Sequence, residues 1–377
     1  ITLGGAVTGL GIESTSFRNG LPHESVVEMD VLTGSGEIVT AAPDGEHADL
    51  FDAFPNSYGS LGYATRLRIE LEAVPAYVDL RHVRFTDLDR LAEAVEAIVA
   101  QRSWQGTRVD AVDGVVFEPG EAYLTLATWR QAAPPGAGQA RGPARASGPS
   151  DYTGQQIYYR SLRAKETDLL TMHDYLWRWD TDWFWCSRAF GAQHPVARRL
   201  WPRRYRRSDV YHRLVGLENR FGLMARMDAA RGRPRRERVV QDVEIPLERL
   251  ADFLRWFDPE VGMRPVWLCP LRLREPQGPG SARRWPSYPL EPGTTYVNVG
   301  FWGTVPIARG AADGDRNRAI EQKVTDLGGH KSLYSESYYD RETFDRLYDG
   351  ANLTRVKEHY DPGSRLTELY EKAVRRR

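Results

Sequence analysis

The strongest constraint on the fold is an order of elements that occurs twice in the chain. YVDLRHVRF at 77–85 alternates apolar and polar residues like a strand, and TDLDRLAEAVEAIVAQ at 86–101 has apolar residues at helical spacing, with Thr86 or Asp87 as its N-cap. Two more strands follow, VDAVDGVVFE and EAYLTLATWR. The same β-α-β-β order returns in VVQDVEI, a helix that begins at Pro246, PVWLCPLRLR and TTYVNVGFW.

Two such halves predict an α+β fold with one antiparallel sheet backed by two helices, a pseudo-repeat of a ferredoxin-like kind. These elements are common in proteins, so a coincidental succession is the alternative. Between the halves lies QAAPPGAGQARGPARASGPS at 131–150. Its Gly, Pro, Ala and Ser content buries little apolar surface, which predicts a flexible surface loop.

The first part of the chain has a different pattern. VVEMDVLTGSGEIVTAAP indicates two strands around a Gly-Ser-Gly turn, which is a hairpin signal. A short helix at 49–53, a glycine loop at 59–62 and a strand at 64–71 follow, the last with Leu67, Ile69 and Leu71 on one side. A compact α+β unit is expected here.

The opening run ITLGGAVTGLGIESTSFRNG interrupts small and hydroxylated residues with glycines at 4, 5, 9, 11 and 20. Glycine permits positive φ and close approach of backbone N–H groups to a ligand, so the run predicts an anion-binding loop that suits a pyrophosphate. No helical pattern follows Gly11, so the G-x-G-x-x-G fingerprint of a Rossmann domain is not satisfied. The chain does not begin with Met, and we expect it to be part of a longer polypeptide.

Charge and cysteine usage disfavour several classes of protein. The chain has 51 Lys and Arg against 51 Asp and Glu, so no global field attracts nucleic acid. Its two cysteines, Cys186 and Cys269, lie among aromatic residues, which favours buried thiols over a metal site or disulfides and indicates a reducing, cytoplasmic compartment. No segment has the roughly 18 uninterrupted apolar residues of a spanning helix. Peripheral membrane contact and the oligomeric state are left open.

One segment is unusually rich in tryptophan and arginine. YLWRWDTDWFWCSRAFGAQHPVARRLWPRRYRRSDVY contains five of the 11 Trp residues of the chain, followed by a basic stretch. Core aromatic packing next to a solvated basic face is one interpretation, and an interfacial patch that touches lipid is the other. No recognised nucleic-acid-binding fold surrounds it.

Several motifs follow one another along the chain: ITLGGAVTGLGIESTSFRNGL, GEIV, DLFDAFPNSYGSLGYATRLRIEL, VVQDVEIP, PVWLCPLRLR, LYSESYYDRETFDRLYDG and RVKEHYDP. Together they resemble the vanillyl-alcohol oxidase (PCMH-type) family of FAD-linked oxidoreductases, and within it the sterol side-chain reductases. The resemblance covers most of the chain except 131–150. The family's first nucleotide-binding subdomain, which would precede Ile1, is missing, as is any residue there that might attach flavin covalently.

The resemblance implies three parts. Residues 1–73 would be the C-terminal portion of a PCMH-type FAD-binding domain, and residues 74–330 a substrate-binding cap domain that holds the antiparallel sheet. Residues 331–377 would be a C-terminal segment that returns to the FAD-binding domain.

FAD binding is implied for the residues that match the family's motifs. The pyrophosphate and ribityl chain would lie against Thr2, Gly4, Gly5, Gly9, Gly11, Ile12 and Ser14, the adenine near the backbone of Ile38 and Val39, and the flavin side near Gly62 and Ala64. Lys357 would be a cation at the N1 and O2 edge of the flavin. Turns and tight packing without a ligand are the alternative for the glycines, and a solvated helix lysine is the alternative for Lys357.

A general acid is sought in HKSLYSESYYD. Tyr334, Glu336 and Tyr338 alternate, so an extended strand would place them on one face, with Lys331 just upstream. In the family this region approaches the substrate side of the flavin. His330 and Glu13 are further candidates, with a capping or loop role as the alternative.

The resemblance implies an FAD-dependent oxidoreductase. In a reductase, NADPH would reduce FAD, and hydride would reach one carbon of an isolated alkene in a sterol or isoprenoid-like lipid while an acid protonates the other. The run ARGRPRRER at 230–238 could meet the 2′-phosphate of NADPH, with a solvated loop as the alternative. An alcohol oxidase or dehydrogenase of the same family, and a non-catalytic binding protein, are the alternative functions.

Overall fold

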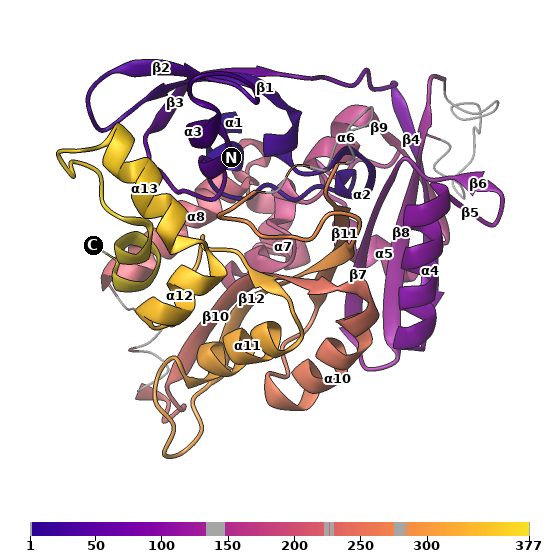
Figure 1. The fold of residues 1–377 in the computed structure, drawn as a ribbon. Helices are drawn as coiled ribbons and strands as arrows, with labels where there is room; N and C mark the ends of the chain where they lie inside the picture. Colours follow the sequence, from indigo (N-terminus) through magenta and orange to yellow (C-terminus); the bar gives the residue numbers. More distant parts are fainter. Residues whose placement is uncertain are drawn as a thin grey trace.

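An eight-stranded antiparallel sheet occupies the centre of the computed structural model, which describes residues 2–132, 148–221, 226, 230–274, 283 and 285–376. The spatial order is β13-β10-β12-β11-β7-β8-β4-β9 (Figure 1). The strands are β4 (Tyr77–Phe85), β7 (Ala111–Glu118), β8 (Glu121–Arg130), β9 (Thr167–Thr171), β10 (Arg236–Pro246), β11 (Val266–Arg272), β12 (Thr295–Pro306) and β13 (His330–Lys331).

The two predicted β-α-β-β halves are confirmed. The first contains β4, α4 (Leu88–Gln101), β7 and β8, and the second contains β10, α10 (Leu250–Glu260), β11 and β12. The halves meet where β7 pairs with β11, with Val116 opposite Val266. Asp87 is the N-cap of α4, whereas the helix predicted from Pro246 begins as a 3₁₀ turn before α10. An α+β fold with a large antiparallel sheet is therefore confirmed.

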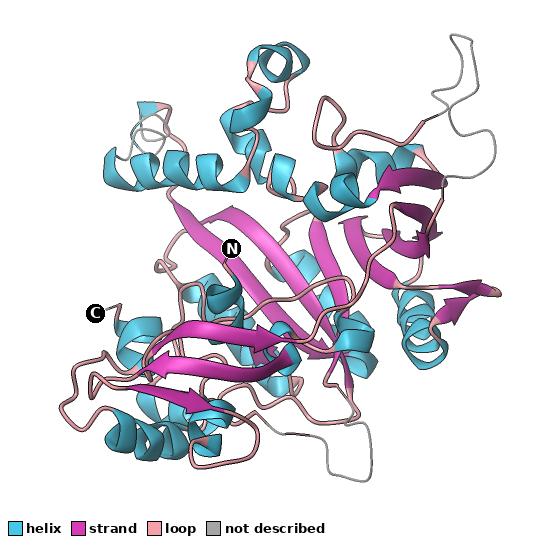
Figure 2. Cartoon of the chain, turned by 90° about the horizontal axis from the view of Figure 1, so that it is seen from above, coloured by secondary structure: helices cyan, strands magenta, loops and turns pink. Residues whose placement is uncertain are grey.

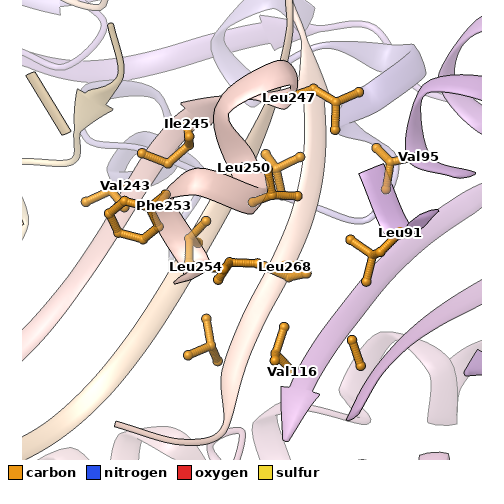
Figure 3. Close-up of a cluster of buried hydrophobic side chains, with 14 of the residues drawn as sticks. Leu91, Val95, Val116, Val243, Ile245, Leu247, Leu250, Phe253, Leu254 and Leu268 are labelled. Atoms are coloured by element: carbon orange, nitrogen blue, oxygen red, sulfur yellow. The ribbon is translucent and has the colours of Figure 1, made fainter. Parts of the chain in front are cut away.

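One face of this sheet packs against α4, α10 and α11 (Asp315–Asp326). Apolar side chains recur at helical spacing along α4 and α10 because each helix buries one stripe against the sheet. Figure 3 shows Leu250, Phe253 and Leu254 of α10 close to Leu268 of β11. The core on this face also contains Leu91, Val95, Val116, Val243, Ile245 and Val299.

A smaller sheet, with the order β2-β1-β3, is built from the first part of the chain. Its strands are β1 (Val26–Leu32), β2 (Ile38–Ala41) and β3 (Tyr63–Ile69), and α3 (Ala48–Ala53) follows β2. The predicted hairpin, short helix and third strand are confirmed. Leu67 and Ile69 pack on the core as expected, but Leu71 lies beyond the strand and is 87% exposed, so its predicted place on that face is wrong.

The end of the chain packs against its beginning. Helices α12 (Arg341–Leu347) and α13 (Gly350–Tyr360) lie beside the smaller sheet (Figure 1). Phe344 and Val356 share a hydrophobic core with Val31 and Leu50. The domain boundaries at 73 and 330 stay predictions.

A second helical layer covers the other face of the large sheet (Figure 2). Its helices are α5 (Tyr158–Ala164), α6 (Met172–Trp177), α7 (Pro195–Leu200) and α8 (Ser208–Phe221). Trp179, Trp185 and buried Cys269 pack here, whereas Cys186 is half-buried; both thiols are free. Of the predicted loop 131–150, residues 133–147 lie outside the described residues. Among the described helices, none combines the length and apolar character that crossing a membrane requires.

We expect Leu268→Ala to lower the free energy of unfolding by about 3 kcal/mol, because it leaves a cavity where the two halves meet under α10. Urea unfolding followed by tryptophan fluorescence measures the change. Leu71→Ala, at an exposed position, is the matched control and should change stability by less than about 0.5 kcal/mol. Equal effects of the two variants would contradict this account of the core.

Candidate active site

The start of the opening glycine run is helical and the rest of it is a loop, and the predicted anion-binding role of these residues stays a prediction. Helix α1 (Leu3–Thr8) contains Gly4 and Gly5, and Thr2 is its N-cap, with Oγ1 accepting a hydrogen bond from Gly5 N at 3.1 Å. Gly9 has a φ of −102°, and Gly11 is not among the positive-φ glycines. The expectation of positive φ at these four glycines is therefore wrong. A Cβ at Gly11 would approach Pro22 Cγ to 2.6 Å, so close packing accounts for this glycine.

The segment after α1 crosses from the smaller sheet to the large one. Thr8 O accepts a hydrogen bond from Tyr58 N at 2.9 Å, and Ser14 O accepts one from Val112 N of β7 at 2.8 Å. The Ser14 hydroxyl lies 2.8 Å from Tyr175 Oη. Ile12 packs between the two cores. The predicted residues Thr2 to Ser14 therefore run along the junction of the two sheets.

Two carboxylates lie on the face of the large sheet that points away from α4 and α10. Asp242 and Glu244 alternate along β10 with Val243 and Ile245, whose side chains enter the helix-covered core. Asn298 of β12, directly opposite Glu244, donates from Nδ2 to Asp242 Oδ1 at 2.9 Å. Glu244 Oε2 and Asn298 Oδ1 are buried and have no hydrogen-bond partner among the described residues. This face therefore carries a buried acceptor-rich cluster.

Burial changes the protonation of this cluster. Desolvation raises the pKa of Asp242, and it raises the pKa of Glu244 well above the ordinary value, with the Asp242 charge adding to the effect. The same cause lowers the pKa of neighbouring His330 to about 3. Burial therefore favours the neutral form of both carboxyl groups and of the imidazole.

The turn after β13 brings Tyr334 to this cluster. Ser332 Oγ donates to Glu244 Oε1 at 3.1 Å, and Trp302 Nε1 donates to Tyr334 Oη at 2.8 Å. Tyr334 is 45% exposed. Desolvation and the nearby Asp242 raise the pKa of its hydroxyl. Residues 333–335 form a turn, so the predicted extended strand through Tyr334, Glu336 and Tyr338 is wrong. The turn allows Tyr334 to reach the sheet face.

The other predicted acid residues have structural partners. Buried Lys331 donates to Glu336 O at 2.8 Å and lies 3.5 Å from Glu321 Oε1, while burial lowers its pKa. Glu336 pairs with Arg376 at 2.7 Å and accepts from Tyr338 Oη at 3.0 Å. These four residues are close in space, but only Tyr334 has its hydroxyl beside Asp242.

A cavity of about 460 Å³ opens next to Tyr334. Tyr58, Tyr334, Glu336 and three basic residues line it, namely Arg238, Lys372 and Arg376. Tyr58 Oη is buried without a hydrogen-bond partner among the described residues, and desolvation raises its pKa. The cavity thus combines aromatic walls with a cationic rim. Arg238, the last residue of the arginine-rich run at 230–238, contributes to that rim.

The remaining predicted cofactor residues lie elsewhere. Lys357 Nζ pairs with Asp361 at 2.5 Å, donates to Ser60 O at 3.2 Å, and lines a separate cavity of about 300 Å³. Ile38 and Val39 belong to the edge strand β2, and Ala64 pairs with Val31. Gly62 has a φ of +142°, and a Cβ there would approach Leu32 O to 2.6 Å. The roles assigned to these residues stay predictions.

Asp242, Glu244, Asn298 and Tyr58 were not predicted from the sequence. A signal was present in VVQDVEIP, where two carboxylates alternate with apolar residues in a strand that is otherwise typical of a core. Buried Asp113 was not predicted either. It lies on the same sheet face and accepts hydrogen bonds from Arg178 Nη2 at 3.0 Å and Trp179 Nε1 at 2.9 Å. Glu13, a predicted candidate for the general acid, is exposed and lies near Asp113 and Arg178. Desolvation raises the pKa of its carboxyl.

Comparison with known proteins indicates an oxidoreductase that resembles the sterol reductases along the whole chain. The chain is 25% identical to Delta(24)-sterol reductase from Arabidopsis thaliana, over 100% of this chain and 68% of that protein. It is also 25% identical to Delta(24)-sterol reductase from Homo sapiens, over 99% of this chain and 67% of that protein. Cytokinin dehydrogenase 9 from Oryza sativa subsp. japonica matches 31% of this chain and 22% of its own at 30% identity. No family model matches. The predicted resemblance to an FAD-linked, sterol reductase-like oxidoreductase is confirmed.

The raised pKa of Glu244 makes stability depend on pH. The folded state keeps this proton at pH values where the unfolded carboxyl, with its ordinary pKa of 4.5, has lost it. The contribution to stability is therefore full below that value and falls as the pH rises towards the folded pKa. We expect Glu244→Gln to reduce the loss of unfolding free energy that accompanies a rise in pH above that value.

Urea unfolding at several pH values measures this dependence. Glu96→Gln, at an exposed position of α4, is the control and should follow the wild-type curve. Parallel curves for wild type and Glu244→Gln would show that the Glu244 carboxyl does not hold a proton in the folded protein.

Proposed function

We propose that the protein is an FAD-dependent reductase that uses NADPH to saturate an isolated C=C bond in a sterol or isoprenoid-like lipid. The observation that carries the proposal is the similarity along the whole chain to proteins named Delta(24)-sterol reductase. Tyr334, which is 45% exposed and lies beside a buried carboxyl cluster, supports it, because adding hydrogen across an alkene needs a proton donor.

The residues at the junction of the two sheets fit a flavin. An isoalloxazine ring carries both hydrogen-bond donors and acceptors, and the buried unpartnered atoms of Tyr58, Glu244 and Asn298 offer both kinds of group. The backbone of residues 2–14 would hold the pyrophosphate and ribityl chain. Gly4 leaves its side of α1 open, since a Cβ there would meet nothing within 4 Å. Reduced FAD would supply hydride to one alkene carbon.

Tyr334 would give its proton to the other alkene carbon. Protonation at the less substituted carbon leaves the developing positive charge on the tertiary carbon, where hydride adds. The raised pKa of Tyr334 keeps the hydroxyl protonated until the alkene is in place. The phenolate would regain its proton from solvent, since Tyr334 is 45% exposed. Trp302 Nε1 would fix the direction of the hydroxyl.

A second candidate is a dehydrogenase that takes hydride from a substrate and passes it to another acceptor. The match to cytokinin dehydrogenase 9 over 31% of the chain favours it. Both candidates use the same flavin site and differ in the direction of hydride transfer. A non-catalytic binding protein would retain no flavin.

An anaerobic absorbance spectrum, recorded on protein from the complete coding region before and after NADPH, tests the proposal. We expect flavin bands that bleach with NADPH and return when a sterol or isoprenoid alkene is added. Bands that bleach only with an alcohol or amine donor would favour the dehydrogenase. Absence of flavin bands would overturn both.

Tyr334→Phe should slow alkene reduction about 100-fold or more, because the proton donor is removed. Bleaching of the flavin by NADPH should be unchanged, since that step needs no proton from Tyr334. Stopped-flow absorbance separates the two half-reactions. Tyr338→Phe is the matched control, because its hydroxyl is bound to Glu336 and should have little influence on either rate. Equal alkene reduction by wild type and Tyr334→Phe would remove Tyr334 from the mechanism.

A further inference from the structure

The segment from α7 to α8, residues 195–221, differs in charge from the rest of the protein. It contains eight arginines and two acidic residues, whereas the whole chain has equal numbers of basic and acidic residues. Arg198 and Arg206 are buried, with Arg198 Nη1 donating to Asp182 Oδ1 at 2.5 Å. The other six arginines are outside the core: Arg199, Arg203, Arg204, Arg207, Arg213 and Arg220.

Helix α8 carries an apolar stripe that belongs to none of the hydrophobic cores of the described residues. Val210, Leu214, Leu217 and Phe221 are spaced by four, three and four residues, so they share one side of the helix. Leu217 and Phe221 are exposed, and Val210 and Leu214 are half-buried. None of the four belongs to a hydrophobic core of the described residues. An amphipathic helix normally turns such a stripe inward, whereas Leu217 and Phe221 of this one are exposed among the described residues.

Helix α7 repeats this pattern. Val196 and Leu200 lie one turn apart and are 61% and 77% exposed, and Tyr205 follows in the connecting turn at 43%. Arg206 closes the connection by donating from Nη2 to Trp201 O at 2.8 Å. Beside Val196 is a cavity of about 570 Å³ lined by Arg160, Arg198 and Arg199. Apolar and cationic groups are therefore adjacent on both helices.

We propose that the exposed side of the α7–α8 segment binds the surface of an anionic lipid bilayer. The apolar residues of α7 and α8 enter the boundary between headgroups and acyl chains, and the exposed arginines contact lipid phosphates. The proposal does not depend on the proposed reaction, because binding to vesicles is measured without turnover. A lipid-like substrate would reach the protein from the same surface.

The charges favour a membrane over two other partners. A symmetric contact with a second copy of the chain would place the same arginine-rich surface on both sides, and these like charges would repel. A nucleic acid would match the charge but would leave Val196, Leu200, Leu217 and Phe221 without an apolar partner. A bilayer with acidic headgroups satisfies both kinds of side chain.

Vesicle flotation tests the proposal with the complete chain. We expect the protein to float with phosphatidylcholine vesicles that contain about 30% phosphatidylserine, and to float far less with pure phosphatidylcholine. Leu217→Asp with Phe221→Asp should lower partitioning at least about tenfold. Arg199→Glu with Arg213→Glu should lower it about fivefold for each residue.

Leu71→Asp is the matched control, since it adds a charge at an exposed leucine far along the chain from this segment and should float like wild type. Circular dichroism and gel filtration accompany each variant, so that loss of binding is attributed only to folded protein. Failure of the wild type to float would overturn the proposal, as would normal flotation of the Leu217 and Phe221 variant. A dimer that this variant converts to a monomer would also overturn it, because a second copy would then cover the stripe.

Discussion

The antiparallel pairing of β7 with β11 is the contact on which the rest of the molecule depends. It joins two β-α-β-β halves into one sheet and removes an exposed edge from each. Gly114 lies at this seam, where a Cβ would approach Tyr123 O to 2.7 Å. Because the sheet is continuous and side chains alternate along strands, residues of both halves share faces. The apolar residues meet α4 and α10, while the side chains of Asp113 in the first half and Asp242 in the other half point to the opposite face.

The polar residues on that opposite face differ in how their burial is compensated. Asp113 has a cation, Arg178, at 3.0 Å and a further donor in Trp179. Asp242 and Glu244 have neutral donors, and the nearby cation Lys331 lies against Glu321 instead. An uncompensated buried carboxylate is costly, so burial raises the pKa of both groups. This face of the sheet thus carries the Asp113–Arg178 ion pair at one end. At the other end it carries Asp242 and Glu244, next to Tyr334.

The sequence predicted elements better than it predicted the site. Strand β4 and helix α4 followed from alternation and a capping Asp87, because local pattern determines such elements. Of the opening glycines, Gly4 and Gly5 lie in a short helix capped by Thr2, whereas Gly9 and Gly11 lie in the loop that follows, with Pro22 packed on Gly11. From the turn at 333–335, Tyr334 reaches Trp302, a contact between residues far apart in the chain that local pattern does not predict. Asp242 and Glu244 acquire their chemistry from burial by the N- and C-terminal segments, which no local pattern in β10 reveals.

The position of Tyr334 follows from backbone pairing rather than from a free loop. Lys331 and His330 form β13 on the outer edge of β10, opposite Val243 and Glu244, and Ser332 N donates to Asp242 O at 3.1 Å. Tyr348 Oη holds Lys331 O at 2.8 Å from the other side. Tyr334 comes two residues after Ser332, whose backbone is fixed next to the carboxyl cluster. A side chain fixed in this way loses little entropy when a ligand arrives.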